Sequence, residues 1–256
     1  MTITVPEVCT LEVRCLGTFG VYDGERRLGP WSSRRAKALL KHLVLHRHRP
    51  VPREVLMEAF WPDAWPAAAR NNLHGAVHAL RRFLRDVHGD VEHVAFEDGC
   101  YSLAPELEVW DDVSEFERLA REARRCEPEA ALALLEAADA LYAGQLFDDD
   151  PYEEWMQPRR RELEAVHLEV LDLLLEHHRE RGALHDWAAV ARRIVAAEPW
   201  REEVQRELMT CYARQGQHSL ALRQFQDCVT ALRTALGATP SEDTVALVDR
   251  IRRRDV

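Results

Sequence analysis

Residues 67–87 read AAARNNLHGAVHALRRFLRDV, and the spacing of their apolar side chains decides the fold of the first third of the chain. The apolar stripe consists of Leu73, Val77, Leu80 and Leu84. Their steps of four, three and four residues match the period of one buried face of an α-helix. We therefore predict a helix over this range, with one side docked against a core and the other side free.

The free side of this helix is rich in long hydrogen-bond donors. They are Arg70, Asn71, Asn72, His74, His78, Arg81, Arg82 and Arg85. Reading the major groove of DNA needs such side chains, because Arg can pair with guanine and Asn with adenine while neighbouring Arg groups hold phosphates. On residue content alone, an ordinary solvated helix face is an equally good interpretation. The neighbouring elements decide between the two.

A small sheet and two short helices are expected before this helix. Residues 11–29 combine β-prone runs with glycine turns, which predicts a small antiparallel sheet. Ser32 or Ser33 is a suitable N-cap for a helix in the sequence RRAKALLKHLVLH. Further along, REVLMEAFW predicts a second helix, which ends at Trp61-Pro62. The apolar side of this second helix is formed by Val55, Leu56, Ala59 and Phe60.

A β-hairpin is expected after the helix of residues 67–87. Asp98-Gly99 separates the β-prone runs VAF and CYSL and is the strongest two-residue turn signal in the chain. A sheet, three helices and a hairpin follow one another in the order of a winged-helix domain, whose third helix reads DNA. This arrangement favours DNA binding over a merely solvated helix face.

Helices take over from Pro105 onward, where the strand pattern ends. Apolar periodicity predicts seven of them, at residues 113–126, 128–142, 158–180, 184–197, 200–215, 218–236 and 241–254. Gly182 and Gly216 lie 34 residues apart, which is the tetratricopeptide period. The repeat pattern around Gly216 is carried by Leu208, Tyr212, Ala221, Phe225 and Cys228.

The predicted fold class is therefore mainly α, with two domains. An N-terminal winged-helix domain (α+β) is expected over residues 1–106, and an all-α tetratricopeptide-like helical-repeat domain over residues 107–256. The net charge of -10 is divided unevenly between them. Residues 1–105 carry 14 basic and 12 acidic groups, net +2, whereas the remainder is net -12. A polyanion such as double-stranded DNA should therefore meet the first part.

Composition also bounds the setting of the protein. A chain of 256 residues with 46% apolar content is typical of a globular protein. No apolar run approaches the roughly 18 to 20 residues needed to span a bilayer, so we expect a cytoplasmic protein without a membrane partner. The six cysteines are scattered without a CxxC pair, which favours reduced thiols.

Metal and enzyme hypotheses find little in the sequence. His42/His46 and His74/His78 have a spacing that can hold zinc, but no Cys or acidic cluster nearby completes a ligand set. Solvated or DNA-facing histidines are expected instead, and the aspartate run 148–150 is expected to be solvated as well. No nucleophile elbow, P-loop or dinucleotide fingerprint occurs in the sequence. We therefore expect no enzyme activity, no cofactor and no metal.

Two long stretches resemble one known family. SSRRAKALLKHLVLHRHRPVPREVLMEAFWPD, AAARNNLHGAVHALRRFLRD and FEDGCYSL resemble the DNA-binding half of SARP-type regulators, an OmpR-like winged helix. The stretch from VWDDVSEFERL to LGATPSEDT resembles their bacterial transcriptional activator domain. Together the two resemblances cover residues 10–254, nearly the entire chain.

The resemblance implies a transcriptional activator that binds direct repeats near promoters, as a tandem pair or homodimer, and recruits RNA polymerase. It implies that the third helix enters the major groove, with Leu80-Arg81-Arg82 in its C-terminal portion. Toward its base-reading end lie Arg70, Asn71, His74 and His78. The loop of residues 61–69 corresponds to a segment expected to touch the polymerase.

One departure from the family concerns the wing. Related wings carry an Arg before the glycine turn, whereas this one has Glu97-Asp98, which would repel phosphate. We therefore expect DNA affinity to depend on the third helix and on Arg34, Arg35 and Lys37. The acidic wing and the nearly neutral first part keep an alternative open. In that alternative the chain is a tetratricopeptide-like protein-interaction module whose winged helix no longer binds DNA.

Overall fold

The computed structural model describes residues 10–88, 92–105 and 107–256, without the side chains of residues 86–88. The chain folds into two compact units. The first comprises Met1–Arg118 and Leu141–Glu162, and the second Leu119–Ala140 and Leu163–Val256. The boundary expected between residues 106 and 107 stays a prediction, and residue 106 itself lies outside the described residues.

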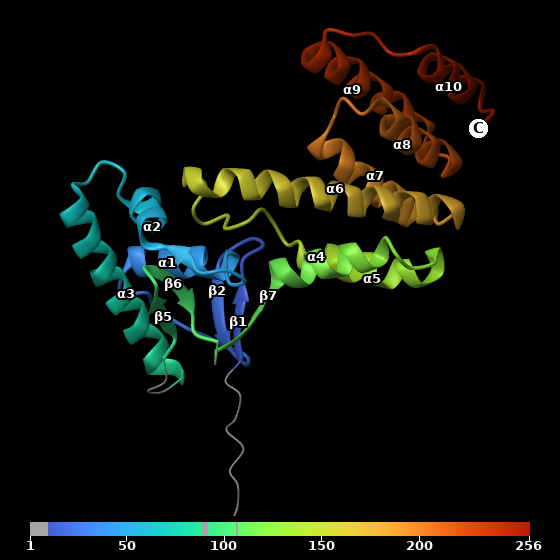
Figure 1. Ribbon diagram of the computed structural model, residues 1–256. Coiled ribbons are helices and arrows are strands. Elements are labelled where there is room, and N and C mark those ends of the chain that lie inside the picture. The colour runs from blue at the N-terminus through green and yellow to red at the C-terminus, as the bar shows by residue number, and fades with distance from the viewer. Residues whose placement is uncertain (1–9, 89–91, 106) are drawn as a thin grey trace, which may run out of the picture. The chain divides into compact units, whose positions relative to one another are not determined.

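The first unit contains a four-stranded sheet (Figure 1). Its strands are β1 (Thr10–Arg14), β2 (Gly20–Asp23), β3 (Arg26–Arg27) and β7 (Glu108–Asp111), in the order β3-β2-β1-β7. The antiparallel pairing of β1, β2 and β3 confirms the small sheet expected there. The expectation that strands end by residue 105 was wrong, because β7 pairs parallel with β1. Its sequence EVWD is too short for a periodic pattern, and its partner is far away in the chain.

The hairpin and its neighbours form a second sheet in the same unit. The strands are β4 (Val51–Pro52), β5 (Val94–Glu97) and β6 (Cys100–Leu103), in the order β4-β6-β5. Asp98 and Gly99 have φ angles of 48° and 79°, the left-handed values that a two-residue type I′ turn requires. The predicted hairpin is confirmed, with Phe96 opposite Tyr101 in its ladder.

Three helices complete the winged-helix core (Figure 1). They are α1 (Arg34–Leu45), α2 (Arg53–Phe60) and α3 (Pro66–His88). Ser33 is the N-cap of α1, and its Oγ accepts a hydrogen bond from the Ala36 amide at 3.2 Å. The predicted stripe of α3 is confirmed, because its four apolar side chains are all buried.

One apolar side chain of α2 lies outside the buried side of the helix, contrary to the prediction. Leu56 and Phe60 are buried, but Val55 is 46% exposed. The helix has only eight residues, so a single pair at i and i+4 is enough to dock it. Val55, next to that pair in sequence, is turned by about 100° away from the buried side.

The segment of residues 145–160, distant in sequence from the sheet, is built into the core of the first unit. Leu146 forms a β-bridge with Leu16, and the Phe147 amide donates to the Cys15 carbonyl at 2.8 Å. The Phe147 ring is fully buried and meets the Phe19 ring edge-on at 5.5 Å. Arg160, which is 7% exposed, donates to the carbonyls of Leu146, Phe147, Asp150 and Pro151. This loop therefore belongs to the first unit's core.

Two aspartates of that loop, Asp149 and Asp150, bind lysines of α1, which corrects the expectation that they are solvated, whereas Asp148 is exposed as expected. Lys41 is completely buried, and its Nζ lies 2.6 Å from Asp150 Oδ2 and 3.1 Å from Asp149 Oδ1. Lys37 also forms an ion pair with Asp149. Burial alone would raise the pKa of Asp149, but the Lys37 and Lys41 ammonium groups lower it below its ordinary value.

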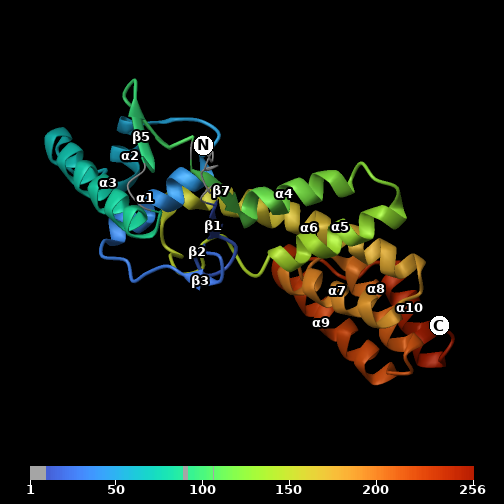
Figure 2. The same cartoon turned by 90° about the horizontal axis from the view of Figure 1, so that it is seen from below.

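From residue 112 onward the described chain forms seven α-helices, as predicted, and one 3-10 turn, η1 (Glu154–Met156). The α-helices are α4 (Asp112–Ala123), α5 (Pro128–Leu141), α6 (Gln157–Glu180), α7 (Leu184–Ala197), α8 (Glu202–Arg214), α9 (His218–Leu236) and α10 (Glu242–Arg253). Within the second unit, α7 to α10 follow one another as packed neighbours (Figure 2). Gly182 and Gly216 occupy the turns after α6 and α8 with positive φ angles, which explains glycine at both positions.

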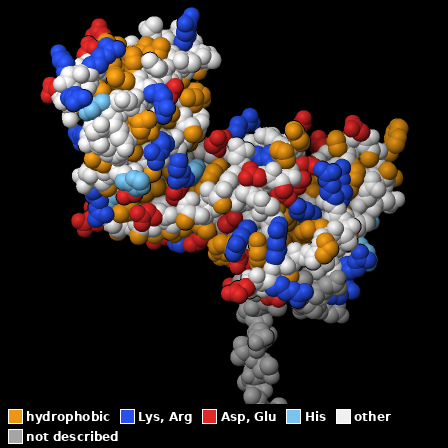
Figure 3. All heavy atoms as spheres, turned by 180° about the vertical axis from the view of Figure 1, so that it is seen from behind, with side chains coloured by type: hydrophobic (Ala, Val, Ile, Leu, Met, Phe, Trp, Pro, Cys, Tyr) orange, Lys and Arg blue, Asp and Glu red, His pale blue; other side chains and the backbone are white. Residues whose placement is uncertain are grey.

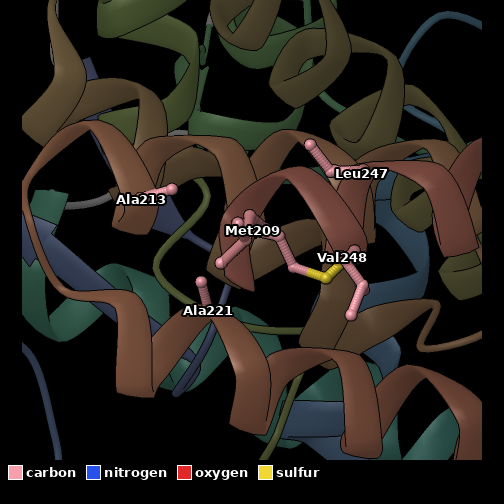
Figure 4. Close-up of a cluster of buried hydrophobic side chains, with 6 residues drawn as sticks. Met209, Ala213, Ala221, Leu247 and Val248 are labelled. Carbon is pink, nitrogen blue, oxygen red and sulfur yellow. The ribbon is translucent and has the colours of Figure 1, made fainter. Parts of the chain in front are cut away.

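The repeat residues form the core of this unit. Leu208, Ala221 and Cys228 are almost completely buried. Figure 4 shows Met209 and Ala213 of α8, Ala221 of α9, and Leu247 and Val248 of α10 meeting in one apolar cluster. Small side chains at 213 and 221 allow α8 and α9 to approach closely, which is the packing logic of stacked helix pairs.

Cysteine and membrane expectations concern the described part of the chain. Five cysteines carry free thiols there, and Cys9 lies outside the described residues. No described helix combines the length and apolarity needed to cross a bilayer.

Candidate nucleic-acid interface

The polar side chains of α3 form one exposed stripe. Asn71, His74, His78, Arg82 and Arg85 are all exposed. They recur every three or four residues, opposite the buried leucines. Arg70 and Asn72 are exposed on either flank of this stripe. The structure thus brings together the amide, imidazole and guanidinium groups that base and phosphate recognition uses.

The two neighbouring arginines of α3 have different surroundings, although the same role was expected of both from the sequence. Arg81 donates to the Val94 carbonyl from Nε at 3.1 Å and from Nη2 at 2.5 Å. It therefore holds strand β5 of the wing against α3. Arg82 is exposed, and among the described residues its guanidinium donates one hydrogen bond, to the Ser32 hydroxyl at 3.4 Å. To contact DNA, Arg81 would have to break or share its hydrogen bonds to the Val94 carbonyl. Arg82 would give up one long hydrogen bond, to Ser32.

The three cations predicted at the start of α1 lie beside acidic groups. Lys37 is paired with Asp149, and the Arg35 guanidinium lies 5.5 Å from the centre of the Trp61 ring. Arg34 and Arg35 line a cavity together with Asp150 and Glu153. The loop of residues 148–154 therefore lowers the positive potential at this end of α1. Sequence reasoning missed this because the acidic groups come more than 100 residues later.

The wing carries negative charge at its tip, as the sequence indicated. Glu97 and Asp98 are exposed, and Phe96, which is 42% exposed, packs its ring 4.5 Å from that of Tyr101. Figure 3 shows basic and acidic side chains intermixed on the face of the molecule that it presents. The α3 stripe is therefore a more suitable contact for phosphate than the wing tip.

The turn between α2 and α3 presents a large apolar side chain. Trp65 is 85% exposed, whereas Trp61 packs against the Phe60 ring at 5.9 Å. Pro62 and Pro66 frame this turn and restrict its backbone. An exposed tryptophan on a short constrained turn is a suitable anchor for a protein partner.

The histidines do not gather into a metal site in the part of the chain that the structure describes, where no three metal-ligating side chains come together. His74 and His78 are exposed on α3. His42, which was expected to be solvated, is 4% exposed and stacks between His46 at 4.3 Å and Trp155 at 4.8 Å. Burial, and then the nearby His46, lower the pKa of His42 to about 4, so this ring is neutral at physiological pH.

A winged helix with an exposed polar third helix, followed by stacked helix pairs, defines the class of DNA-binding transcriptional regulators. Two family models match the chain accordingly. The model described as "Bacterial transcriptional activator domain" covers residues 111–252, and "Transcriptional regulatory protein, C terminal" covers residues 31–99. The chain belongs to the bacterial transcriptional activator domain family, and its winged helix is of the OmpR-like type found in SARP regulators.

Named relatives agree with this class. The chain is 26% identical over 251 residues to the regulatory protein AfsR of Streptomyces griseus. This match covers 96% of the chain and 25% of that relative. It is also 26% identical over 230 residues to the transcriptional regulatory protein MoaR1 of Mycobacterium tuberculosis. This match covers 88% of the chain and 74% of the relative. The chain thus spans only a quarter of AfsR but about three quarters of MoaR1.

A solved structure shows the same fold. Mycobacterium tuberculosis EmbR, in complex with a low-affinity phosphopeptide, superposes with a TM-score of 0.73 at 24% sequence identity. The match covers 96% of this chain and 66% of that one. The mainly helical architecture with a winged helix at its start is therefore shared.

Proposed function

We propose that this protein is a sequence-specific DNA-binding transcriptional activator whose helix α3 enters the major groove of direct repeats in promoters. The exposed stripe of Asn71, His74, His78, Arg82 and Arg85 on α3 is the observation that carries the proposal. Both matched family models describe regulators rather than enzymes. They also disfavour the alternative of a protein-interaction module without DNA binding. Such a regulator acts where the chromosome lies, in the cytoplasm.

The proposal assigns different tasks to different side chains of the stripe. Asn71 offers the paired donor and acceptor that adenine recognition requires, so it reads bases. Arg82, exposed and only weakly bonded to Ser32, holds a phosphate. Arg70, Asn72, His74, His78 and Arg85 supply further contacts on and beside the stripe. Weaker DNA contacts are expected from Arg34, Arg35, Lys37 and Arg81. Each of these side chains already interacts with, or lies beside, other groups of the protein.

Binding to the chain's own upstream DNA, measured at several salt concentrations, tests these assignments. Arg82→Ala should weaken specific and non-specific binding alike and reduce the slope of log K against log salt by about 1, since one phosphate contact is lost. Asn71→Ala should lower specific binding by roughly tenfold and leave the salt slope unchanged. The matched control is Arg223→Ala, which removes an exposed arginine from α9.

A double change of Arg81 and Arg82 to Ala should weaken promoter binding strongly and flatten the salt dependence further. Because Arg81 also holds the wing strand, urea unfolding of Arg81→Ala must be measured beside its DNA affinity. Equal affinity and equal salt slope in the double variant and the wild type would refute the assignment of α3. A gel shift without any complex at low salt would refute DNA binding as such.

RNA polymerase and a second copy of the chain are the proposed protein partners. The exposed Trp65 on the turn before α3 is the feature that suits the polymerase contact. Trp65→Ala should keep promoter affinity but lose activation of transcription in a purified system. A wild-type level of transcription from this variant would refute the contact. Sedimentation on DNA with one or two repeats tests tandem binding, which predicts one chain for each repeat.

A further inference from the structure

A cavity lies in the first unit, and none of its lining residues belongs to α3. It has a volume of about 450 Å³ and lies between the C-terminal end of α1 with the turn after it and the segment where η1 leads into α6. Leu45, His46, His48, Arg49, Trp155, Pro158, Arg159 and Glu162 line it. Cavities that bind small molecules in proteins have volumes of about 300 to 1,000 Å³. The size is therefore right for a metabolite and too small for a folded partner.

The apolar walls of the cavity are held in place. Leu45, Trp155 and Pro158 provide them. The Trp155 ring stacks on His42 at 4.8 Å and meets Phe60 edge-on at 5.9 Å. Its Nε1 atom is buried and has no hydrogen-bond acceptor among the described residues. Because this N–H is closed off from solvent, Trp155 contributes its ring to the cavity as an apolar wall.

The polar lining favours a negative charge. Glu162 is the single acidic group among the eight lining residues, and it accepts a hydrogen bond from Arg159 at 3.1 Å. Arg159 also pairs with Glu117 at 2.8 Å, so its charge is largely balanced. Arg49 is exposed, and its guanidinium has no hydrogen bond or ion pair within the described ranges. Arg49 is therefore the available cation of the cavity.

The two histidines of the lining differ in what they offer to a carboxylate. The imidazole Nδ1 of His46 lies 2.8 Å from the His42 carbonyl, and since a carbonyl only accepts, this nitrogen is the donor. In the neutral ring the other nitrogen of His46 is then an acceptor, so His46 offers no donor to a carboxylate. His48 Nε2 accepts a hydrogen bond from Arg47 Nε at 3.4 Å, so the neutral ring of His48 carries its hydrogen on Nδ1 and offers a donor. Arg49 and His48 together therefore suit a carboxylate and disfavour a cationic molecule.

We propose that this cavity binds a small planar carboxylic acid, whose ring packs against Leu45, Trp155 and Pro158 and whose carboxylate is held by Arg49. Apolar walls with one available guanidinium match a molecule with one flat apolar part and one negative charge. A phosphate or polyphosphate would require several free cations, which this lining lacks. The site is distinct from the α3 stripe and does not depend on DNA binding.

Isothermal titration of the full chain with indole-3-acetate tests the proposal. Indole-3-acetamide and tryptamine are the matched neutral and cationic probes, because they keep the same ring. We expect indole-3-acetate to bind at least tenfold more tightly than either. Arg49→Gln should weaken indole-3-acetate binding by about tenfold or more, as expected for the loss of a charge-assisted hydrogen bond. The matched control, Arg26→Gln, changes an exposed arginine of β3 and should leave the affinity unchanged.

The indole N–H resonance of Trp155 gives a local readout. It is assigned by its loss in Trp155→Phe, which keeps an aromatic wall but removes the donor. Addition of indole-3-acetate should shift this resonance in the wild type, because the bound ring lies beside Trp155, and should shift it much less in Arg49→Gln. Three results would overturn the proposal: no binding of the acid at millimolar concentration, equal binding of acid and amide, or unchanged affinity in Arg49→Gln with its folded spectrum retained.

Discussion

Replacing Lys41 by Met removes the central charge of the first unit while keeping a similar apolar volume. The Lys41 side chain is fully buried, whereas those of its partners Asp149 and Asp150 are 22% and 18% exposed. Its Nζ also lies 4.9 Å from the Phe19 ring centre and 4.5 Å from that of Phe147. The variant therefore loses two ion pairs and two cation–π contacts, and leaves two carboxylates near a hydrophobic core.

The expected loss in the free energy of unfolding is about 3 kcal/mol. Removing one partner of a buried ion pair costs about 3 to 5 kcal/mol, because the remaining charge is left without compensation. Water reaches about a fifth of each carboxylate, and Lys37 still pairs with Asp149, so the lower end applies. Lys37→Met is the matched control. Its side chain is 24% exposed and has one ion partner, so we expect a loss of about 1 kcal/mol or less.

Urea unfolding followed by tryptophan fluorescence measures this difference. Five of the seven tryptophans, at positions 31, 61, 65, 110 and 155, belong to the first unit, so the signal reports mainly on it. The triple variant Lys41→Met, Asp149→Asn, Asp150→Asn should recover at least about 1 kcal/mol of the loss, since both carboxylates are then neutral and Lys37, which loses its partner Asp149, is partly exposed to water. A stability of Lys41→Met within about 0.5 kcal/mol of the wild type would refute the reasoning.

Three further predictions concern the same unit. Burial raises the pKa of Asp112 to about 6, so the folded state gains stability as the pH falls from 7 to 5. Burial lowers the pKa of His42 to about 4, so the folded state loses stability as the pH falls below about 6.5, where the histidine of the unfolded chain takes up a proton. When the pH falls from 7 to 5, the free energy of unfolding of Asp112→Asn should change by about 1 kcal/mol less favourably than that of the wild type, and that of His42→Phe by about 2 kcal/mol more favourably. Parallel pH profiles of the three proteins would contradict this. Ser33→Ala should destabilise the unit by about 1 kcal/mol in urea, through loss of the N-cap of α1, with exposed Ser32→Ala as its control. A fragment ending at residue 106 should lack the sharp amide spectrum of a folded protein, whereas a fragment ending at residue 162 should keep it, because only the longer one contains Phe147 and Asp150.

Elements with a local periodic pattern could be predicted from the sequence. The helix stripe from Leu73 to Leu84, the Asp98-Gly99 turn and the seven later helices all have their cause within a few neighbouring residues. The exposed stripe of α3 could be predicted for the same reason, because burying one side of a helix leaves the other side to solvent.

Pairings across long stretches of chain could not be predicted in this way. Strand β7 exists because β1 offers it an edge, and residues 145–150 join the first unit through Cys15, Gly17 and two lysines. The difference between Arg81 and Arg82 has the same origin, since only the folded position of Val94 separates their roles. A pattern among neighbouring residues in the sequence does not indicate which distant residue they contact in the fold.

The interrupted course of the first unit bears on how the protein is made. After Arg118 the next 22 residues, Leu119–Ala140, belong to the other unit, and Leu141–Glu162 belongs to the first unit again. While the ribosome is still adding those residues, Phe19 and Lys41 have emerged without Phe147 and Asp150, their partners in the finished protein. The DNA-reading part, although encoded early, therefore matures only once residue 162 has left the exit tunnel. Until then a nascent chain exposes an apolar surface and a cation that chaperones can recognise.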